Sequence, residues 1–169
     1  IAEGDYLAFL DSDDLWKPEK LSRQVEFMEA GDYEITCTSY GKIDENGVEQ
    51  KKVCMSLPEY TYDDVLIKCP GNSTMMYNSN KLGKIQGPII KKRNDLALWL
   101  RIIKKSQKIY GIEDVLSFHR VRSGSLSDNK TDLLKYQYIV YRHIEKLPLH
   151  KTIWLLLNKV IQTVMNKNG

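Results

Sequence analysis

The chain has 169 residues, of which 42% are hydrophobic and 28% charged, and its formal net charge is +3 at pH 7. This length suits one ordinary domain with a real core, and the composition excludes the disordered and fibrous classes. The small net charge gives no general attraction to nucleic acid, and the basic residues do not alternate with aromatic ones as in a nucleic-acid-binding module. No nucleic-acid partner is therefore expected.

The cysteines and the hydropathy pattern bear on the cellular compartment. Cys37, Cys54 and Cys69 are odd in number and have no Cys-x-x-Cys spacing, which argues against a disulfide framework and a zinc site. No apolar run approaches the roughly 18 to 20 residues needed to span a bilayer, and the N-terminus lacks the basic and apolar regions of a signal peptide. These features predict a cytoplasmic protein.

The first predicted elements are a strand and a helix joined by an acidic turn. The segment DYLAFLD is a short apolar run that follows Gly4 and predicts a strand at about residues 5–10. Pro18 fits the first turn of a helix, and Gly31 stands where that helix would end. The apolar residues at helical spacing between them are Leu21, Val25 and Met28. The sequence has no initial methionine and begins directly with this strand, as the middle of a domain would.

A hairpin, a short helix and a further strand are predicted next. YEITCTSYGKID has the composition of a strand, and Glu45-Asn46-Gly47 is a hairpin turn signal before VEQKKVCM. TYDDVLIKC predicts a short helix and STMMYNS a strand. In KKRNDLALWLRIIKKS, an apolar repeat predicts a helix that begins at Asn94 or Asp95. The repeat consists of Leu96, Trp99, Leu100 and Ile103.

The last third of the chain contains more β-structure and then helices. QKIYGIEDVLSFHRVR predicts one or two strands and SGSLSDN a loop, and two amphipathic helical segments separated by Pro148 follow from Thr131. The final segment combines apolar residues with lysines, which is typical of a helix that packs on the domain's own core or lies on a membrane surface. The fold class is therefore α/β, a mixed sheet flanked by helices, with amphipathic helices at the C-terminus.

Three carboxylates, Asp11, Asp13 and Asp14, lie at the end of the first predicted strand. Side chains at i and i+2 on a strand point the same way, so Asp11 and Asp13 are expected to converge on one ligand. Carboxylate oxygens suit Mg²⁺ or Mn²⁺, which proteins usually share with substrate phosphates. The alternative is an acidic turn that caps the following helix.

This stretch, GDYLAFLDSDDLWKPEKL, resembles glycosyltransferase family 2, whose members have the GT-A fold and an Asp-x-Asp motif at this place. The resemblance implies an inverting transferase that depends on Mn²⁺ or Mg²⁺. Asp13 would bind the metal on the diphosphate of a nucleotide sugar, with a UDP-sugar as the expected donor. Asp11 would contact the ribose or assist at the metal.

A second segment, RNDLALWLRI, resembles the family's Glu-Asp motif at the start of a helix, with Asn94 in place of Glu. The resemblance makes Asp95 the general base, because an inverting transfer needs a carboxylate that takes the proton of the acceptor hydroxyl. A helix N-cap is the simpler role for either residue. GNSTMMYNSNKLGKIQG resembles the acceptor-side segment and adds Asn72 and Thr74, and with Asn94 and Trp99 these residues form the expected acceptor side.

A third segment, FHRVRSGSLS, resembles the family segment that contains basic residues near the diphosphate. Arg120 and Arg122 would bind phosphate oxygens there. His119 stands at a position that is more often aromatic, and it is a further candidate metal ligand or a structural histidine. The basic run at 91–93 would attract a phosphorylated donor or a lipid-linked acceptor, or would be a solvated charge cluster.

The resemblance divides the chain into a partial GT-A domain at residues 1–130 and a helical extension at 131–169. The βαβ half with which the family normally begins, and which binds the nucleotide base, has no counterpart here, so the domain is expected to be truncated at its N-terminus. The implied function is sugar transfer to a saccharide or lipid-linked acceptor in polysaccharide synthesis. The implied partners include the inner face of the cell membrane and a second copy of the chain.

Two other functions remain open. A phosphatase of the haloacid dehalogenase type also carries Asp-x-Asp after an apolar strand, with Asp11 as nucleophile and Asp13 as acid and base. Leu15 stands where that family has Thr or Val, and its later GDxxxD pattern is missing. The other alternative is a non-catalytic remnant that binds partners or membranes.

Overall fold

The computed structural model describes residues 2–122 and 130–165. Two short helices, η1 and η2, are of the 3-10 and π type respectively. In chain order the elements are β1 (Tyr6–Ala8), β2 (Leu15–Trp16), α1 (Lys20–Ala30), β3 (Ile35–Ile43), β4 (Glu49–Cys54), β5 (Glu59–Thr61), α2 (Tyr62–Ile67), η1 (Asn72–Thr74), β6 (Met76–Asn78), α3 (Ser79–Leu82), α4 (Asn94–Ser106), β7 (Lys108–Arg120), α5 (Lys130–Ile139), η2 (Val140–Ile144) and α6 (Leu149–Met165).

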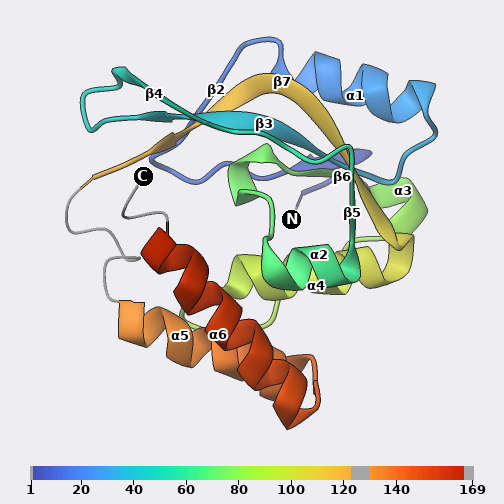
Figure 1. Cartoon of the computed structure of the whole chain (residues 1–169). Coiled ribbons are helices and arrows are strands. Elements are labelled where there is room, and N and C mark those ends of the chain that lie inside the picture. The colour runs from blue at the N-terminus through green and yellow to red at the C-terminus, as the bar shows by residue number, and fades with distance from the viewer. Residues whose placement is uncertain (1, 123–129, 166–169) are drawn as a thin grey trace.

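The sheet is built around two long strands, β3 and β7, which pair in parallel from Thr36 opposite Tyr110 to Ile43 opposite Arg120. All the other pairings are antiparallel. The strand order is β1-β6-β3-β7-β2, with β4 also paired to β3 and β5 also paired to β7. Each long strand therefore has one partner near its start and another near its end, and the sheet curls (Figure 1).

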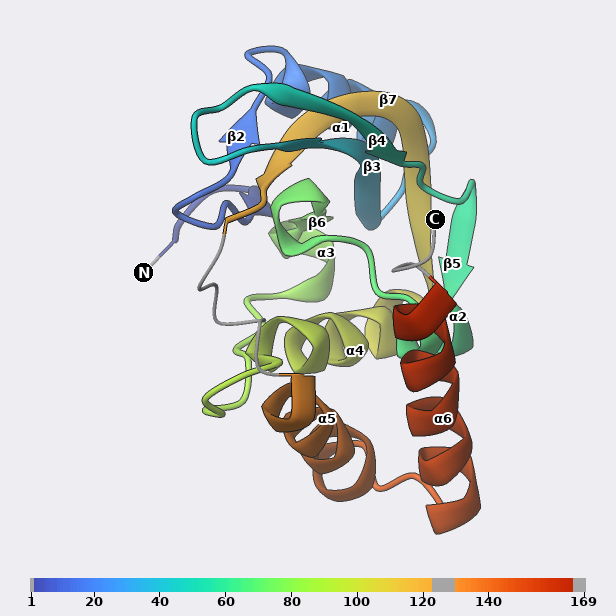
Figure 2. The same ribbon diagram turned by 60° about the vertical axis from the view of Figure 1, so that its left-hand side comes forward.

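The helices cover both faces of this sheet. α1 lies on one face, and α2 and α4 lie on the other (Figure 1). α5 and α6 run back past each other in a further layer beneath α4 and α2 (Figure 2). The core between the sheet and α4 is formed by side chains with almost no exposed surface, among them Ile35, Cys37, Tyr77, Trp99, Leu100 and Ile103.

Most predicted elements are confirmed. The hairpin signal produces the β3–β4 pair, whose turn has Gly47 at φ 87°. The stretch KIYGIEDVLSFHR is a single strand, β7. α4 begins at Asn94, as predicted, but its N-cap is Arg93, which has a left-handed backbone (φ 62°) and no side-chain capping bond. Asn94 and Asp95 lie inside the first turn of α4. The predicted loop at 123–129 lies outside the described residues.

The buried side of α1 also differs from its apolar repeat. It consists of Lys20, Gln24 and Met28, whereas Leu21 is 45% exposed. The Lys20 ammonium lies 4.2 Å from the centre of the Trp16 ring and donates a hydrogen bond to Gln24. Burial lowers the pKa of Lys20 to about 7, because a low-dielectric interior disfavours the charged form.

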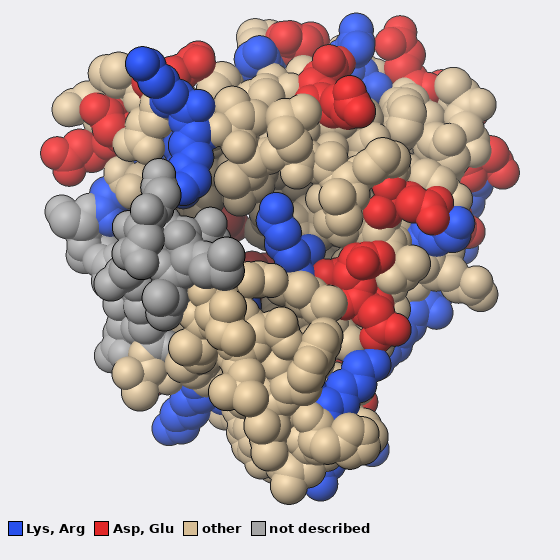
Figure 3. Space-filling view, viewed as in Figure 1, with Lys and Arg blue, Asp and Glu red and all other residues tan. Residues whose placement is uncertain are grey.

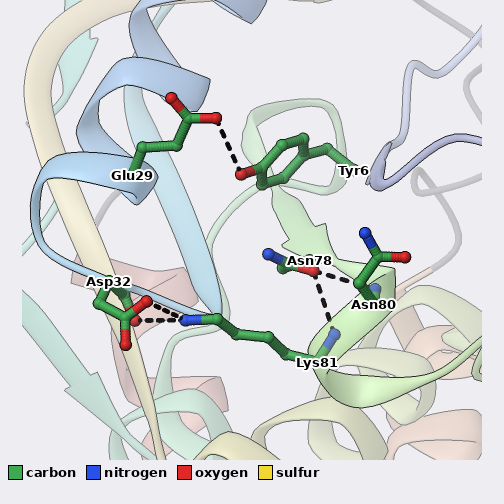
Figure 4. A network of polar contacts seen from close by, with 6 residues as sticks. All are labelled: Tyr6, Glu29, Asp32, Asn78, Asn80 and Lys81. Carbon is green, nitrogen blue, oxygen red and sulfur yellow. Dashed lines mark hydrogen bonds and ion pairs between the residues drawn. The ribbon is translucent and has the colours of Figure 1, made fainter.

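Polar contacts between α1, β1 and α3 support the edge of the sheet (Figure 4). The Tyr6 hydroxyl donates to Glu29 Oε1 at 3.3 Å, and Lys81 donates to the carboxylate and the carbonyl oxygen of Asp32. The Asn78 side chain caps α3 by accepting hydrogen bonds from its first N–H groups. These contacts fix the ends of β1 and β6, and β1 leads into the acidic turn.

The last helix, α6, has two different sides. Thr152 and Leu155 are buried against the domain, so the helix packs on the core as one prediction had it. The opposite side exposes large apolar residues at 41 to 57% of their surface. These residues are Leu149, Ile153, Trp154, Leu157, Val160 and Ile161. Within the described residues, no helix combines the length and the apolar character that crossing a bilayer requires.

Candidate active site

The acidic residues after β1 form a tight turn and not a continued strand. β1 ends at Ala8, and the Asp14 N–H donates to the Asp11 carbonyl oxygen at 3.0 Å. The turn, and not alternation along a strand, therefore sets the directions of the Asp11 and Asp13 side chains. Asp11 lines a cavity beside this turn, whereas the Asp13 carboxylate pairs with Arg122 at 3.2 Å.

Asp14 holds this turn in place, a role that the sequence did not indicate. Its side chain is buried, and its two oxygens accept hydrogen bonds from the Ser73 hydroxyl at 2.6 Å and from the Arg120 N–H at 3.0 Å. The Ser73 hydroxyl also accepts a hydrogen bond from the Asp11 N–H at 3.0 Å. The Trp16 indole donates to the Ser73 carbonyl at 2.6 Å. The turn is thus fixed to η1, a segment some sixty residues later in the chain.

Asn72 links Asp11 to the core. Its amide nitrogen donates to Asp11 Oδ1 at 2.8 Å, and its oxygen accepts a hydrogen bond from the Trp99 indole at 3.0 Å. Trp99 has no exposed surface, because it lies on the core side of α4 against the rings of Phe9 and Tyr77. Trp99 therefore cannot contact an acceptor as the sequence prediction placed it. It orients Asn72, which in turn orients Asp11.

The three basic residues at the end of β7, His119, Arg120 and Arg122, have different contacts. Arg120 donates to backbone oxygens of Asp13, Asp44 and Glu45, at 2.8, 3.0 and 3.0 Å, and so ties the acidic turn to the β3–β4 hairpin. Arg122 faces the acidic turn through its ion pair with Asp13. His119 lines the same cavity as Asp11, with its ring 6.1 Å from that of Tyr40.

The cavity has a volume of about 190 Å³, and the molecular surface is hollowed near the centre of the face seen in Figure 3. Three buried polar atoms of its wall, Arg93 Nε, Ser117 Oγ and Gln137 Oε1, have no hydrogen-bond partner among the residues described. The residues that line it are Asp11, Asp14, Tyr40, Val65, Leu66, Ile67, Cys69, Pro70, Gly71, Asn72, Ser73, Thr74, Arg93, Asp95, Leu96, Ser117, Phe118, His119, Gln137 and Lys159.

Asp95 stands on the wall of this cavity in the first turn of α4. In the part of the chain that the structure describes, its carboxylate has neither a hydrogen bond nor an ion pair. Thr74 also lines the cavity, with its hydroxyl donating to the Gly71 carbonyl at 2.6 Å. Asn94 is exposed and is absent from the cavity wall. Of the four expected acceptor-side residues, Asn72 and Thr74 thus reach the cavity, and Asn94 and Trp99 do not.

Two basic residues, Arg93 and Lys159, line the same cavity as Asp95. Burial raises the pKa of Cys69 and the nearby Asp95 carboxylate raises it further, whereas Lys159 and Arg93 act in the opposite direction. Burial lowers the pKa of Lys159, and the neighbouring Arg93 lowers it further. Lys159 belongs to α6, so the helical layer contributes to the site. The amphipathic pattern of α6 gave no signal for this, because it assigns lysines to solvent.

The donors available for a divalent ion are few. Across residues 2–122 and 130–165, no three His, Cys, Asp or Glu side chains gather closely enough to form a site of their own. Asp11, Asp13 and His119 are the groups near the turn that could supply one or two ligands. This number fits an ion that substrate phosphates help to hold, which is the usual arrangement for Mg²⁺.

Comparison with known proteins places this arrangement in a family. The model of the family described as glycosyl transferase family 2 matches residues 1–91. TuaG of Bacillus subtilis, a glycosyltransferase assigned provisionally to teichuronic acid biosynthesis, is 39% identical over 154 residues, which are 90% of this chain and 61% of that protein. WfaP of Escherichia coli, a UDP-Glc:α-D-GlcNAc-diphosphoundecaprenol β-1,3-glucosyltransferase, is 36% identical over 92% of this chain and 61% of its own length.

Solved structures agree on the fold. The crystal structure of S. aureus TarS 1–349 in complex with UDP matches 92% of this chain and 46% of that one, with a TM-score of 0.56 and 17% sequence identity. This likeness confirms the predicted GT-A fold. The chain spans 61% of the length of the curated relatives named above. Since the family model covers more than half of its residues, the chain belongs to glycosyl transferase family 2.

Proposed function

We propose that the chain carries the diphosphate end, the catalytic base and the acceptor side of an inverting glycosyltransferase. The enzyme would move a sugar from a nucleotide-diphosphate sugar, with UDP as the expected nucleotide, to a lipid-linked saccharide. One observation supports this proposal above the others: Asp95, without a partner among the described residues, lies on the wall of the same cavity as Asp11. An inverting transfer needs a free carboxylate at the acceptor hydroxyl and a polar site for the departing diphosphate.

The donor end is proposed at the acidic turn. Asp11 is held by Asn72 and the turn by Asp14, so the carboxylates are oriented before any ligand arrives. Arg122 is exposed enough to exchange its pairing with Asp13 for phosphate oxygens. Arg120 serves as a positioning residue, because its side chain is engaged with backbone carbonyl oxygens.

The expected cofactor is Mn²⁺ or Mg²⁺, held by Asp13 and Asp11 together with the diphosphate, with His119 as a further candidate ligand. When bound, such an ion neutralises the negative charge that gathers on the departing diphosphate. Asp95 takes the proton of the acceptor hydroxyl. Asn72 and Thr74 line the wall between the two ends and position the acceptor sugar.

Contact with the cytoplasmic face of a membrane belongs to the same proposal. WfaP acts on a diphosphoundecaprenol-linked acceptor, and a lipid-linked acceptor of that kind would present its sugar at the bilayer surface. The exposed apolar side of α6 is of the type that lies in such an interface. We expect the chain to sediment with anionic vesicles and Leu157→Ser to weaken this binding. Equal vesicle binding by the unaltered chain and by Leu157→Ser would contradict the proposed membrane contact of α6.

The test of the donor end is a calorimetric titration of this chain with UDP, with and without Mn²⁺. The proposal predicts binding that requires Mn²⁺ and is lost in Asp13→Ala, while Asp63→Ala, an exposed carboxylate on α2, serves as the control. Transfer of sugar from a UDP-sugar to a lipid-linked saccharide should be lost in Asp95→Asn, because the amide cannot accept the proton. Transfer that survives both Asp13→Ala and Asp95→Asn would overturn the proposal.

A further inference from the structure

We infer that Arg93, Lys159 and Gln137, which line the same cavity as Asp95, form a subsite for the phosphate-bearing end of the acceptor, a glycosyl diphosphate. This inference rests on the proposed function and names the part of the acceptor that the C-terminal helices recognise. Three separate segments supply it: the N-cap of α4, the last turn of α5 and the last turns of α6. All three side chains line the cavity that also contains Asp95.

Arg93 is a buried donor without an acceptor. Its Nε atom is inaccessible to solvent and has no hydrogen-bond partner among the described residues. Neither its guanidinium nor the Lys159 ammonium has an ion pair with any carboxylate that the structure describes. Two neighbouring cations without a counter-ion are costly to bury, and an anionic ligand would remove that cost.

The start of α4 adds to this positive field. α4 has 13 residues, and its first N–H groups, next to Arg93 and Asp95, have no carbonyl partners within the helix. An α-helix of this length has a partial positive charge at its N-terminus, where phosphate groups commonly bind. This positive field attracts an anion and repels a cation, so an anion is the ligand that fits.

Gln137 points to a ligand that also carries hydroxyl groups. Its side chain is 2% exposed, and its amide nitrogen donates to the Tyr141 hydroxyl, which itself donates to the Leu66 carbonyl. The Tyr141 hydrogen is thus already used, so the amide must present its nitrogen there. Gln137 Oε1 is left as an acceptor on the cavity wall without a partner in the described chain. A sugar hydroxyl is a suitable donor for it.

The subsite is distinct from the donor end. The donor end is held by the hydrogen bonds of Asp11 and Asp14 with Asn72 and Ser73, and among the described residues none of Arg93, Gln137 and Lys159 takes part in these bonds. The cavity of about 190 Å³ is smaller than the pockets that enclose drug-sized ligands, so it fits a sugar or phosphate group and not a whole nucleotide sugar. Asp95 lines the same cavity as both sets of residues, so a base for the acceptor hydroxyl is present there.

The test compares two acceptors that differ only in charge. One is N-acetylglucosaminyl diphosphate esterified to a short prenol, and the other is the neutral prenyl glycoside of the same sugar. In Lys159→Met and Arg93→Asn, we expect the ratio of kcat/KM for the diphosphate over the neutral acceptor to fall roughly 10- to 100-fold, the value of a charge-assisted hydrogen bond. Lys159→Arg should recover most of the ratio, and Lys135→Met, an exposed lysine on α5, should keep it. An unchanged ratio in both variants would overturn the inference.

A binding measurement separates this inference from the proposed function. The chain is titrated calorimetrically with the prenyl diphosphate acceptor alone and, separately, with UDP and Mn²⁺. Weaker acceptor binding in Lys159→Met with unchanged UDP binding supports the subsite even if no sugar is transferred, in which case only the proposed function fails. Equal weakening of UDP binding would assign the two cations to the donor diphosphate and overturn the inference. An unaltered chain that does not bind the acceptor would overturn it as well.

Discussion

Lys20 offers a direct test of how this fold stabilises the region behind the acidic turn. It is a lysine without exposed surface, held by the Trp16 ring and Gln24, and it has no carboxylate partner among the described residues. Lys20→Met keeps the length of the side chain and removes the charge. Because burial lowers the pKa of Lys20 from 10.5 to about 7, the substitution should change the pH dependence of stability and not only its value.

The sign follows from proton binding. From about pH 7 to about pH 10 the unfolded chain holds a proton on this lysine that the folded chain has released, so the stability of the native protein rises with pH in that window. At ~1.4 kcal/mol per pH unit, less the part still protonated near the folded pKa, the gain is about 2 kcal/mol between about pH 7 and about pH 9. Below about pH 7 both states carry the proton and this contribution becomes constant.

The assay is urea denaturation at several pH values, followed by tryptophan fluorescence, for the native protein, Lys20→Met and Lys51→Met. Lys51 is an exposed lysine on β4 and serves as the control. The advantage of Lys20→Met over the native protein should be greatest near neutral pH and should shrink by about 2 kcal/mol toward pH 9. Buried Cys37 changes stability with pH in the opposite direction, because burial raises its pKa to about 12. This contribution is common to the three proteins and cancels when their stabilities are compared. A stability difference that stays constant with pH would refute the reasoning.

Three further predictions concern packing and the site. Gly111→Ala should destabilise the protein by about 3 kcal/mol in urea denaturation, because the new Cβ would lie 1.9 Å from the Leu57 carbonyl oxygen. Gly87→Ala is the control and should cost far less, because a Cβ there has no neighbour nearer than 3.5 Å. Asp14→Asn should cost about 2 kcal/mol, because an amide cannot accept both of its buried hydrogen bonds, and should weaken calorimetric binding of Mn²⁺ and UDP. Trp99→Phe should lower stability by about 1 to 2 kcal/mol and slow sugar transfer, since the Asn72 amide loses its indole donor.

The elements of the fold could be predicted from the sequence because they depend on local signals. The hairpin follows from Glu45-Asn46-Gly47, and the apolar repeat before Ile103 predicts α4. The buried side of α1 could not be predicted in this way. Lys20 and Gln24 are buried because they find partners in Trp16, Thr36 and the Thr74 backbone, which are brought together only in the folded chain.

The site was predicted only in part for the same reason. The resemblance to the family singled out Asp11 and Asp95, and the structure has both on the wall of one cavity, whereas their roles stay predictions. It gave no indication that Asp14 holds the turn through Ser73, because that bond joins residues far apart in sequence. Lys159 could not be singled out from the sequence, since a pattern that repeats every 3.6 residues does not reveal which lysine faces a cavity.

The central position of β7 has a consequence for the order in which the molecule folds. β7 pairs with β3, β2 and β5, and these partners precede it in the chain by long separations, the longest joining Leu15 to Phe118. Pairings between distant segments cost loop entropy before they contribute stability, so chains dominated by them fold slowly. During synthesis, β2 and β5 therefore wait for β7 to emerge from the ribosome, and the acidic turn acquires its contact with the Arg120 N–H only then.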